Sequence, residues 1–131
     1  MRMTRFWLKL EQAVEMVLEA IEHMQGGELY VKKIPSMRMP DLAKAIAPDK
    51  KIVEVGIRPG EKIHEQMITV ADAPNTIEFN DFYIILPQIK MESIDYYYPN
   101  AKRVPDNFEY HSGNNDRWLT IEEMKKLISE I

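Results

Sequence analysis

The 131-residue chain is predicted to be a small α/β protein, with α+β as the alternative, from three patterns in its sequence. Near the N-terminus, apolar residues recur every three or four positions, which is typical of an amphipathic helix. In the middle, short apolar runs alternate with a second helical stretch. Further on, two apolar runs around a short polar turn predict a β-hairpin. The length suits a single domain over residues 1–131.

The first helix is expected to run from Trp7 to Met24. Charged and amide side chains occupy one side of it, and the opposite side carries Trp7, Leu10, Val14, Val17, Leu18, Ile21 and Met24. Gly26 and Gly27 end the helix, because glycine readily adopts the left-handed conformation found after helix C-termini. Residues 28–34 then read as a short strand.

The middle of the chain is expected to alternate between helix and strand. Pro40 and Asp41 suit the first turn of a two-turn helix, which Pro48 ends. The run KIVEVGI at residues 51–57 reads as a second strand. Residues 61–68, which follow a Pro-Gly pair, read as another short helix.

The last third is expected to hold the hairpin, an irregular loop and a final helix. Residues 76–79 and 82–86 form the two strands, joined by a polar turn. Residues 87–118 are rich in turn-forming and aromatic residues and are expected to be ordered but irregular. The sequence TIEE at residues 120–123 is a capping box, which predicts a helix running to about Ser129.

Composition excludes several classes of partner and location. A net charge of −4 argues against a general attraction to nucleic acid or to an anionic membrane, since such partners require clustered Lys and Arg. No apolar run approaches the roughly 20 residues that span a bilayer, and Glu11 interrupts any secretory signal. The chain has no cysteine, so disulfides and thiolate zinc sites are excluded. We therefore expect a cytoplasmic protein.

The sequence also lacks the common cofactor and metal motifs. Its five glycines are too dispersed for a dinucleotide-binding or phosphate-binding loop. His64-Glu65 begins like a zinc-protease motif, but Ile68 stands where the second histidine is needed. Tyr98 and Lys102 have the spacing of a dehydrogenase Y-x-x-x-K pair, but the intervening Pro-Asn opposes the helix that would align them. We assign no catalytic, cofactor-binding or metal residue.

Residues 56–65, GIRPGEKIHE, place Arg58 at the mouth of a Pro-Gly turn. A planar guanidinium offers paired N–H donors to phosphate oxygens, so Arg58 suits an anionic ligand. The alternative is that Arg58 only pairs with Glu61 or Glu65 on the surface. The residues alone leave both interpretations open.

Five short motifs occur in one order along the chain. They are MTRFW (residues 3–7), KIPSM (33–37), DLAKA (41–45), GIRPGEKIHE (56–65) and SGNN (112–115). Together they closely resemble the C-terminal part of bacterial UDP-N-acetylglucosamine 4,6-dehydratases. These enzymes of nucleotide-sugar and surface-polysaccharide biosynthesis belong to the extended short-chain dehydrogenase/reductase superfamily. The resemblance covers essentially the whole chain.

The resemblance implies a small substrate-side domain without a complete Rossmann domain. Family enzymes are NADP-dependent lyases, and their N-terminal Rossmann half holds NADP and the catalytic residues. By the same resemblance, Arg5 and Arg58 clamp the diphosphate of a UDP-sugar. Glu61 then holds Arg58 or a sugar hydroxyl, and the alternative is that it only favours the positive end of the dipole of its predicted helix. This chain is thus expected to bind no cofactor and to be inactive alone.

Our leading hypothesis is a C-terminal fragment of such a dehydratase that contributes UDP-sugar diphosphate contacts. The expected partners are a UDP-sugar, bound weakly, and a separate N-terminal Rossmann half. The apolar side of the first helix would lack its cover in an isolated chain, so a homo-oligomer is also expected. The alternatives are a non-enzymatic nucleotide-sugar-binding module and a self-associating structural module.

Overall fold

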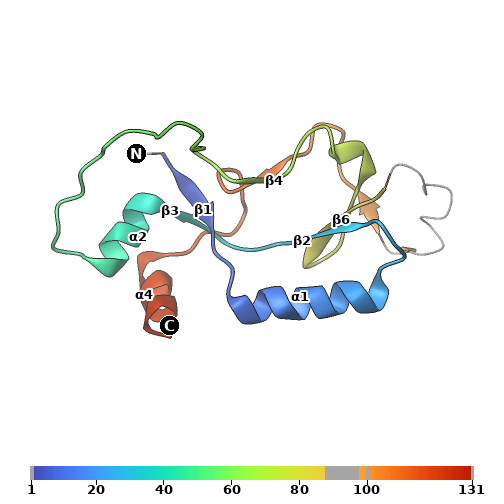
Figure 1. The fold of residues 1–131 in the computed structure, drawn as a ribbon, viewed down its shortest axis with the longest axis horizontal. Helices are drawn as coiled ribbons and strands as arrows, with labels where there is room; N and C mark the ends of the chain where they lie inside the picture. Colours follow the sequence, from blue (N-terminus) through green and yellow to red (C-terminus); the bar gives the residue numbers. More distant parts are fainter. Residues whose placement is uncertain (1, 88–97, 100, 131) are drawn as a thin grey trace. The chain divides into compact units, whose positions relative to one another are not determined.

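The structure is a computed structural model that describes residues 2–87, 98–99 and 101–130. It is a small mixed arrangement of helices and short antiparallel strands with no complete Rossmann fold in its described part, as the sequence predicts (Figure 1). The chain divides into two compact units. The first comprises Met1–Trp7, Ile34–Gln66 and His111–Ile131, and the second comprises Leu8–Lys33 and Met67–Tyr110. The boundaries fall partly within strands β4 (Gln66–Ile68) and β8 (Tyr110–His111).

Two short strands organise the first unit. Strand β1 (Thr4–Phe6) pairs antiparallel with β3 (Ser36–Arg38), and Arg5 lies opposite Met37. A parallel bridge joins Ser36 to Trp118. We did not predict β1 or β3, because three residues are too few to reveal the alternation of a strand.

Two helices complete the first unit. Helix α2 (Met39–Ile46) begins at the Pro40 turn, as predicted, and packs against α4 (Ile121–Ser129). The predicted capping box of α4 is confirmed: Thr120 Oγ1 accepts the N–H of Glu123 at 3.2 Å, and Glu123 Oε2 accepts the N–H of Thr120 at 2.8 Å. The bonds from the backbone and hydroxyl of Thr120 hold the pKa of Glu123 below its usual value.

The core of the first unit is made of sulfur-containing and aliphatic side chains. Met37, Leu119 and Met124 are buried, and Met124 is 0% exposed. Partly buried side chains pack around them: Trp7, Met39, Leu42, Ala45, Ile121 and Leu127. This core joins β3, α2 and α4, and so fixes the strand that pairs with β1.

The predicted strand at residues 51–57 and the predicted helix at 61–68 are both wrong. Residues 51–57, all within the described part, form neither helix nor strand, and Val55 is 85% exposed. A β-strand needs a neighbour for its backbone hydrogen bonds, and no described residue supplies one. In Figure 1 this stretch (green) is part of the long loop between α2 and β4. Residues 66–68 form β4 instead of a helix.

The second unit contains a four-stranded antiparallel sheet. Its strand order is β2 (Leu29–Lys32), β6 (Phe82–Ile85), β5 (Thr76–Glu78) and β7 (Lys102–Arg103). The β5–β6 hairpin and the strand after the first helix are therefore confirmed. The buried side chains of this unit's core are Ile77, Ile84 and Leu86.

The predicted irregular loop at 87–118 is described only in part. Residues 88–97 and 100 lie outside the described residues, and the remainder contains β7 and β8. Lys102 belongs to strand β7, so it does not share a helical turn with Tyr98. The Y-x-x-x-K spacing is a coincidence, as predicted.

Helix α1 (Leu10–His23) begins three residues later than predicted. The N–H of Trp7 donates to Pro35 O at 2.9 Å, which keeps this part of the chain extended. Within the described structure no residue of α1 is buried, and Leu10 remains 76% exposed. The apolar side of α1 is therefore open to contacts beyond those described.

Asp72 caps the turn before the short 3-10 helix η1 (Ala73–Asn75). Its Oδ2 accepts the hydroxyl of Thr69 at 2.6 Å and the N–H of Thr69 at 2.9 Å. These bonds, the hydroxyl first, hold the pKa of Asp72 below its ordinary value.

A lowered folded-state pKa adds stability that is present above the ordinary aspartate pKa and lost as the pH falls through the lowered value. We expect Asp72→Asn to remove this part of the acid sensitivity. Melting temperatures at about pH 6 and about pH 2.5 should therefore differ less for the variant than for the parent. Equal differences would contradict this role for Asp72.

Candidate functional site

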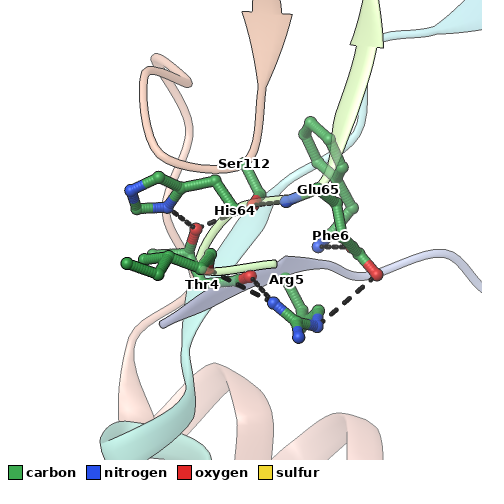
Figure 2. A network of polar contacts seen from close by, with 7 residues as sticks. Thr4, Arg5, Phe6, His64, Glu65 and Ser112 are labelled. Atoms are coloured by element: carbon green, nitrogen blue, oxygen red, sulfur yellow. Dashed lines mark hydrogen bonds and ion pairs between the residues drawn. The ribbon is translucent and has the colours of Figure 1, made fainter. Parts of the chain in front are cut away.

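A partly buried polar network joins three distant segments of the first unit. We call it the Thr4 network, and it contains Thr4, His64, Glu65 and Ser112. Thr4 Oγ1 lies 2.7 Å from His64 Nδ1 and 2.7 Å from Ser112 Oγ, and the N–H of Glu65 donates to Ser112 Oγ at 2.9 Å (Figure 2). Thr4 is 5% exposed and Ser112 is 0% exposed. A ligand has no access to these two hydroxyls. Their hydrogen bonds instead hold the three segments together.

Gly113 is required by the position of His64. A Cβ built at Gly113 would lie 2.6 Å from His64 Nδ1, which is closer than any real carbon contact. His64 is also held by His111, whose ring stacks on it at a centroid distance of 5.4 Å. The imidazole of His64 is therefore a packed side chain of the Thr4 network.

Asn115 performs a similar role for strand β3. Its side-chain amide donates to Ile34 O at 2.6 Å and to Ser36 Oγ at 3.0 Å. The backbone carbonyl of Asn115 accepts the indole N–H of Trp118 at 2.7 Å. The SGNN motif thus holds separate segments of the first unit together.

Arg5 lies beside the Thr4 network and has several internal partners. Its Nη1 donates to Thr4 O at 2.7 Å and to Ile63 O at 3.3 Å. Its Nε lies 3.6 Å from Glu65 Oε1, while Glu65 Oε2 accepts the N–H of Phe6 at 2.8 Å. Figure 2 shows the guanidinium lying against these groups. Nη2 is the nitrogen of the Arg5 side chain with neither a hydrogen bond nor an ion pair within the described residues.

A tight turn presents Arg58. The N–H of Glu61 donates to Arg58 O at 3.0 Å, and Gly60 has a φ of 82°. Pro followed by a residue of positive φ is typical of a type II turn, in which glycine is favoured at the third position. Glu61 Oε2 accepts the N–H of Arg58 at 3.1 Å, so this carboxylate holds the turn. Because no helix begins here, Glu61 does not act on a helix dipole.

The side chain of Arg58 forms no ion pair within the described part of the chain. Glu61 binds its backbone N–H instead, and Glu65 is engaged with Phe6 and Arg5. The surface pairing of Arg58 with Glu61 or Glu65 that the sequence left open is therefore not observed.

Arg58 lines a cavity of about 460 Å³ in the first unit, which we call the arginine cavity. Arg2, Glu54 and Glu61 supply its other charged groups. The rest of the lining is mostly apolar: Met3, Met39, Ala43, Ile52, Val53, Val55, Gly56, Ile57 and Ile63. The structure therefore brings Arg58 and Glu61 together, leaves Arg5 beside the Thr4 network, and adds Arg2, which no sequence pattern singled out. An arginine near the start of the chain gave no signal in sequence that set it apart.

The described residues contain neither a metal-binding cluster nor a membrane-spanning helix. Among the described residues, no three His, Asp or Glu side chains gather closely enough to hold a metal ion. No helix in the described ranges is long and apolar enough to cross a membrane.

The glycines of this chain do not form a dinucleotide-binding loop. A dinucleotide-binding loop needs closely spaced glycines between a strand and a helix, so that the pyrophosphate can approach the helix N-terminus. Here Gly26 and Gly27 follow α1, Gly56 and Gly60 lie in the long loop, and Gly113 packs on His64. None of them opens a helix.

Comparison with known proteins gives the same family as the five motifs. The sequence is 43% identical over 134 residues to the UDP-N-acetylglucosamine 4,6-dehydratase (inverting) of Campylobacter jejuni, covering 98% of this chain and 40% of that enzyme. It is 33% identical to the UDP-glucose 4-epimerase of Rickettsia canadensis, over 96% of this chain and 38% of the epimerase.

A solved structure agrees with this result. The X-ray structure of Pen from Bacillus thuringiensis superposes with a TM-score of 0.79 at 30% identity, over 98% of this chain and 39% of that one. The chain thus spans about two fifths of the length of these relatives, and it corresponds to the C-terminal part of the dehydratase.

The sequence model of a family described as "Polysaccharide biosynthesis protein" matches residues 1–87. That match includes β1, the long loop with Arg58, and the β5–β6 hairpin. Since it extends over more than half of the sequence, the chain belongs to the polysaccharide biosynthesis protein family.

Proposed function

We propose that this chain contributes UDP-sugar diphosphate contacts of a UDP-N-acetylglucosamine 4,6-dehydratase in nucleotide-sugar and surface-polysaccharide biosynthesis. One observation carries the proposal: Arg58, whose guanidinium has no ion-pair partner among the described residues, lines a cavity of about 460 Å³. An arginine that binds phosphate needs unpaired N–H donors along one edge of its guanidinium, and Gly60 lets the turn approach a ligand closely.

In this proposal Glu61 and Arg5 support Arg58. Glu61 fixes the turn through the Arg58 N–H, which sets where the guanidinium begins. Arg5 uses Nη1 and Nε internally and offers Nη2 to the second phosphate.

The catalytic steps belong to another part of the enzyme in this proposal. A separate N-terminal Rossmann half would hold NADP, since the glycines of this chain do not fit a dinucleotide. The exposed apolar side of α1 supports an interface, either with that half or with a second copy of this chain. Both partners would be cytoplasmic.

The first test is a calorimetric titration with UDP and uridine. UDP is expected to bind weakly and less tightly as salt is added, because guanidinium–phosphate contacts are screened. Uridine is expected to bind far more weakly, because it has no phosphate. If UDP does not bind at millimolar concentration, the diphosphate role of this chain is wrong.

Variants of Arg58 test whether this side chain contacts the diphosphate. A charge-assisted contact is worth roughly 1.5–3 kcal/mol, and about 1.4 kcal/mol is a factor of ten. Arg58→Ala should therefore weaken UDP by about tenfold or more. Arg58→Lys keeps the charge but loses the planar fork, so it should also weaken UDP.

The matched control is Lys51→Gln. Lys51 is an exposed cation in the same long loop, and it does not line the arginine cavity. The Lys51→Gln substitution removes one positive charge, as Arg58→Ala does. If both variants bind UDP equally, Arg58 makes no specific contact with the diphosphate.

A further inference from the structure

Two arginines line the arginine cavity, and neither side chain forms an ion pair with a described residue. Arg2 forms no hydrogen bond or ion pair there, and Arg58 uses only its backbone N–H in the turn. Arg5, by contrast, is tied to Thr4 O, Ile63 O and Glu65. The two arginines that line this cavity are therefore Arg2 and Arg58.

The backbone that follows Arg2 is anchored at two points. Met3 O accepts the N–H of Met39 at 3.1 Å, and the N–H of Thr4 donates to Ile63 O at 2.9 Å. Met39 and Ile63 both line the cavity. Arg2 thus extends from a fixed piece of chain, so that little backbone order remains to be gained when it binds a ligand.

The cavity lining carries two glutamates beside the two arginines, so it favours an anion only where the carboxylates are engaged by other groups. Glu61 accepts the N–H of Arg58, and Glu54 has a further interaction in the structure. Two like charges facing the same space repel one another, and a bound phosphate relieves this repulsion. The mostly apolar remainder of the lining suits an uncharged, flat part of the same ligand.

We propose that Arg2 is a second phosphate-binding residue of the arginine cavity and acts with Arg58 on one phosphate-bearing nucleotide. This inference rests on the proposed function, and it adds a residue that neither the motifs nor the comparisons assign. Arg5 keeps the Nη2 contact proposed above, and its bonds to Thr4 O and Ile63 O also hold the strand that follows Arg2.

The test is calorimetry of the 131-residue chain with UDP, UMP and uridine, at low and raised salt, for Arg2→Ala, Arg58→Ala, the double variant and Lys51→Gln. Arg2→Ala is expected to weaken UDP by about fivefold to tenfold and to reduce the salt dependence of binding. It should leave uridine unchanged, because Arg2 contacts phosphate. The double variant should bind UDP more weakly than either single variant.

The outcomes separate this inference from the proposed function. If Arg58→Ala weakens UDP while Arg2→Ala behaves like Lys51→Gln, the role of Arg2 is overturned and the role of Arg58 stands. If Arg2→Ala weakens uridine as much as UDP, Arg2 does not contact phosphate, and the inference is again wrong. If the parent chain does not bind UDP, both proposals fail. Circular dichroism spectra matching the parent would show that each variant is folded.

Discussion

Replacement of Gly113 with alanine is expected to destabilise the protein by about 1–3 kcal/mol, the usual cost of inserting a methyl group into a fully packed site. The new Cβ would lie 2.6 Å from His64 Nδ1 and 2.8 Å from two ring carbons. The ring cannot move aside cheaply, since Thr4 holds its Nδ1 at 2.7 Å and His111 stacks on its face. The melting temperature should fall by about 4 °C for each kcal/mol lost.

A double variant identifies the cause of this loss. His64→Ala removes the ring that Gly113 faces, so Gly113→Ala should cost little when it is added to His64→Ala. Urea unfolding of the four proteins gives the coupling free energy between the two positions. If Gly113→Ala destabilises both backgrounds equally, its effect comes from the backbone of the turn and the contact with His64 is unimportant.

The second large effect is expected at Met124, on the buried side of α4. Truncation of a fully buried methionine to alanine costs about 2–5 kcal/mol, because apolar contacts are lost and a cavity remains. Met124 is 0% exposed and packs in the same core as Met37 and Leu119. The midpoint of urea unfolding should shift accordingly, even though alanine is the better helix former.

Met24 provides the matched control, since it is 43% exposed at the end of α1. Met24→Ala should change the free energy of unfolding by less than about 0.5 kcal/mol, as is usual at exposed positions. Equal losses at Met24 and Met124 would mean that Met124 is not packed as described.

Local signals in the sequence predicted several elements correctly. The capping box at Thr120 predicted the start of α4, because it satisfies free N–H groups at the helix start whatever the tertiary structure. Pro40 predicted α2 for a similar reason, and the polar turn predicted the β5–β6 hairpin. In each case the deciding interactions lie within a few residues of one another.

The predictions at residues 51–57 and 61–68 are wrong because the conformation there depends on contacts with residues that are distant in sequence. Residues 51–57 have the pattern of a strand but lack a neighbouring strand in the described structure. Residues 63–65 are held out of a helix because Thr4 bonds to Ile63 O and Ser112 bonds to the backbone of Glu65. A window of sequence around residue 64 contains neither Thr4 nor Ser112.

The candidate site was predictable only in part for the same reason. Arg58 stands in a Pro-Gly turn that the sequence displays directly, so it could be singled out. The bonds of Arg5 to Ile63 O and Glu65, and the position of Arg2 on the cavity, depend on segments about 60 residues apart in sequence being brought together.

Helix α1 has a consequence for the dynamics of the chain. It is 14 residues long, and in the described structure none of its side chains is buried. An isolated helix of this length is only marginally stable in water, because most helical stability in proteins comes from tertiary packing. Its amide hydrogens should therefore exchange with solvent through local opening, independently of global unfolding. The exchange rate of these amides would then measure directly how firmly any partner covers the apolar side of α1.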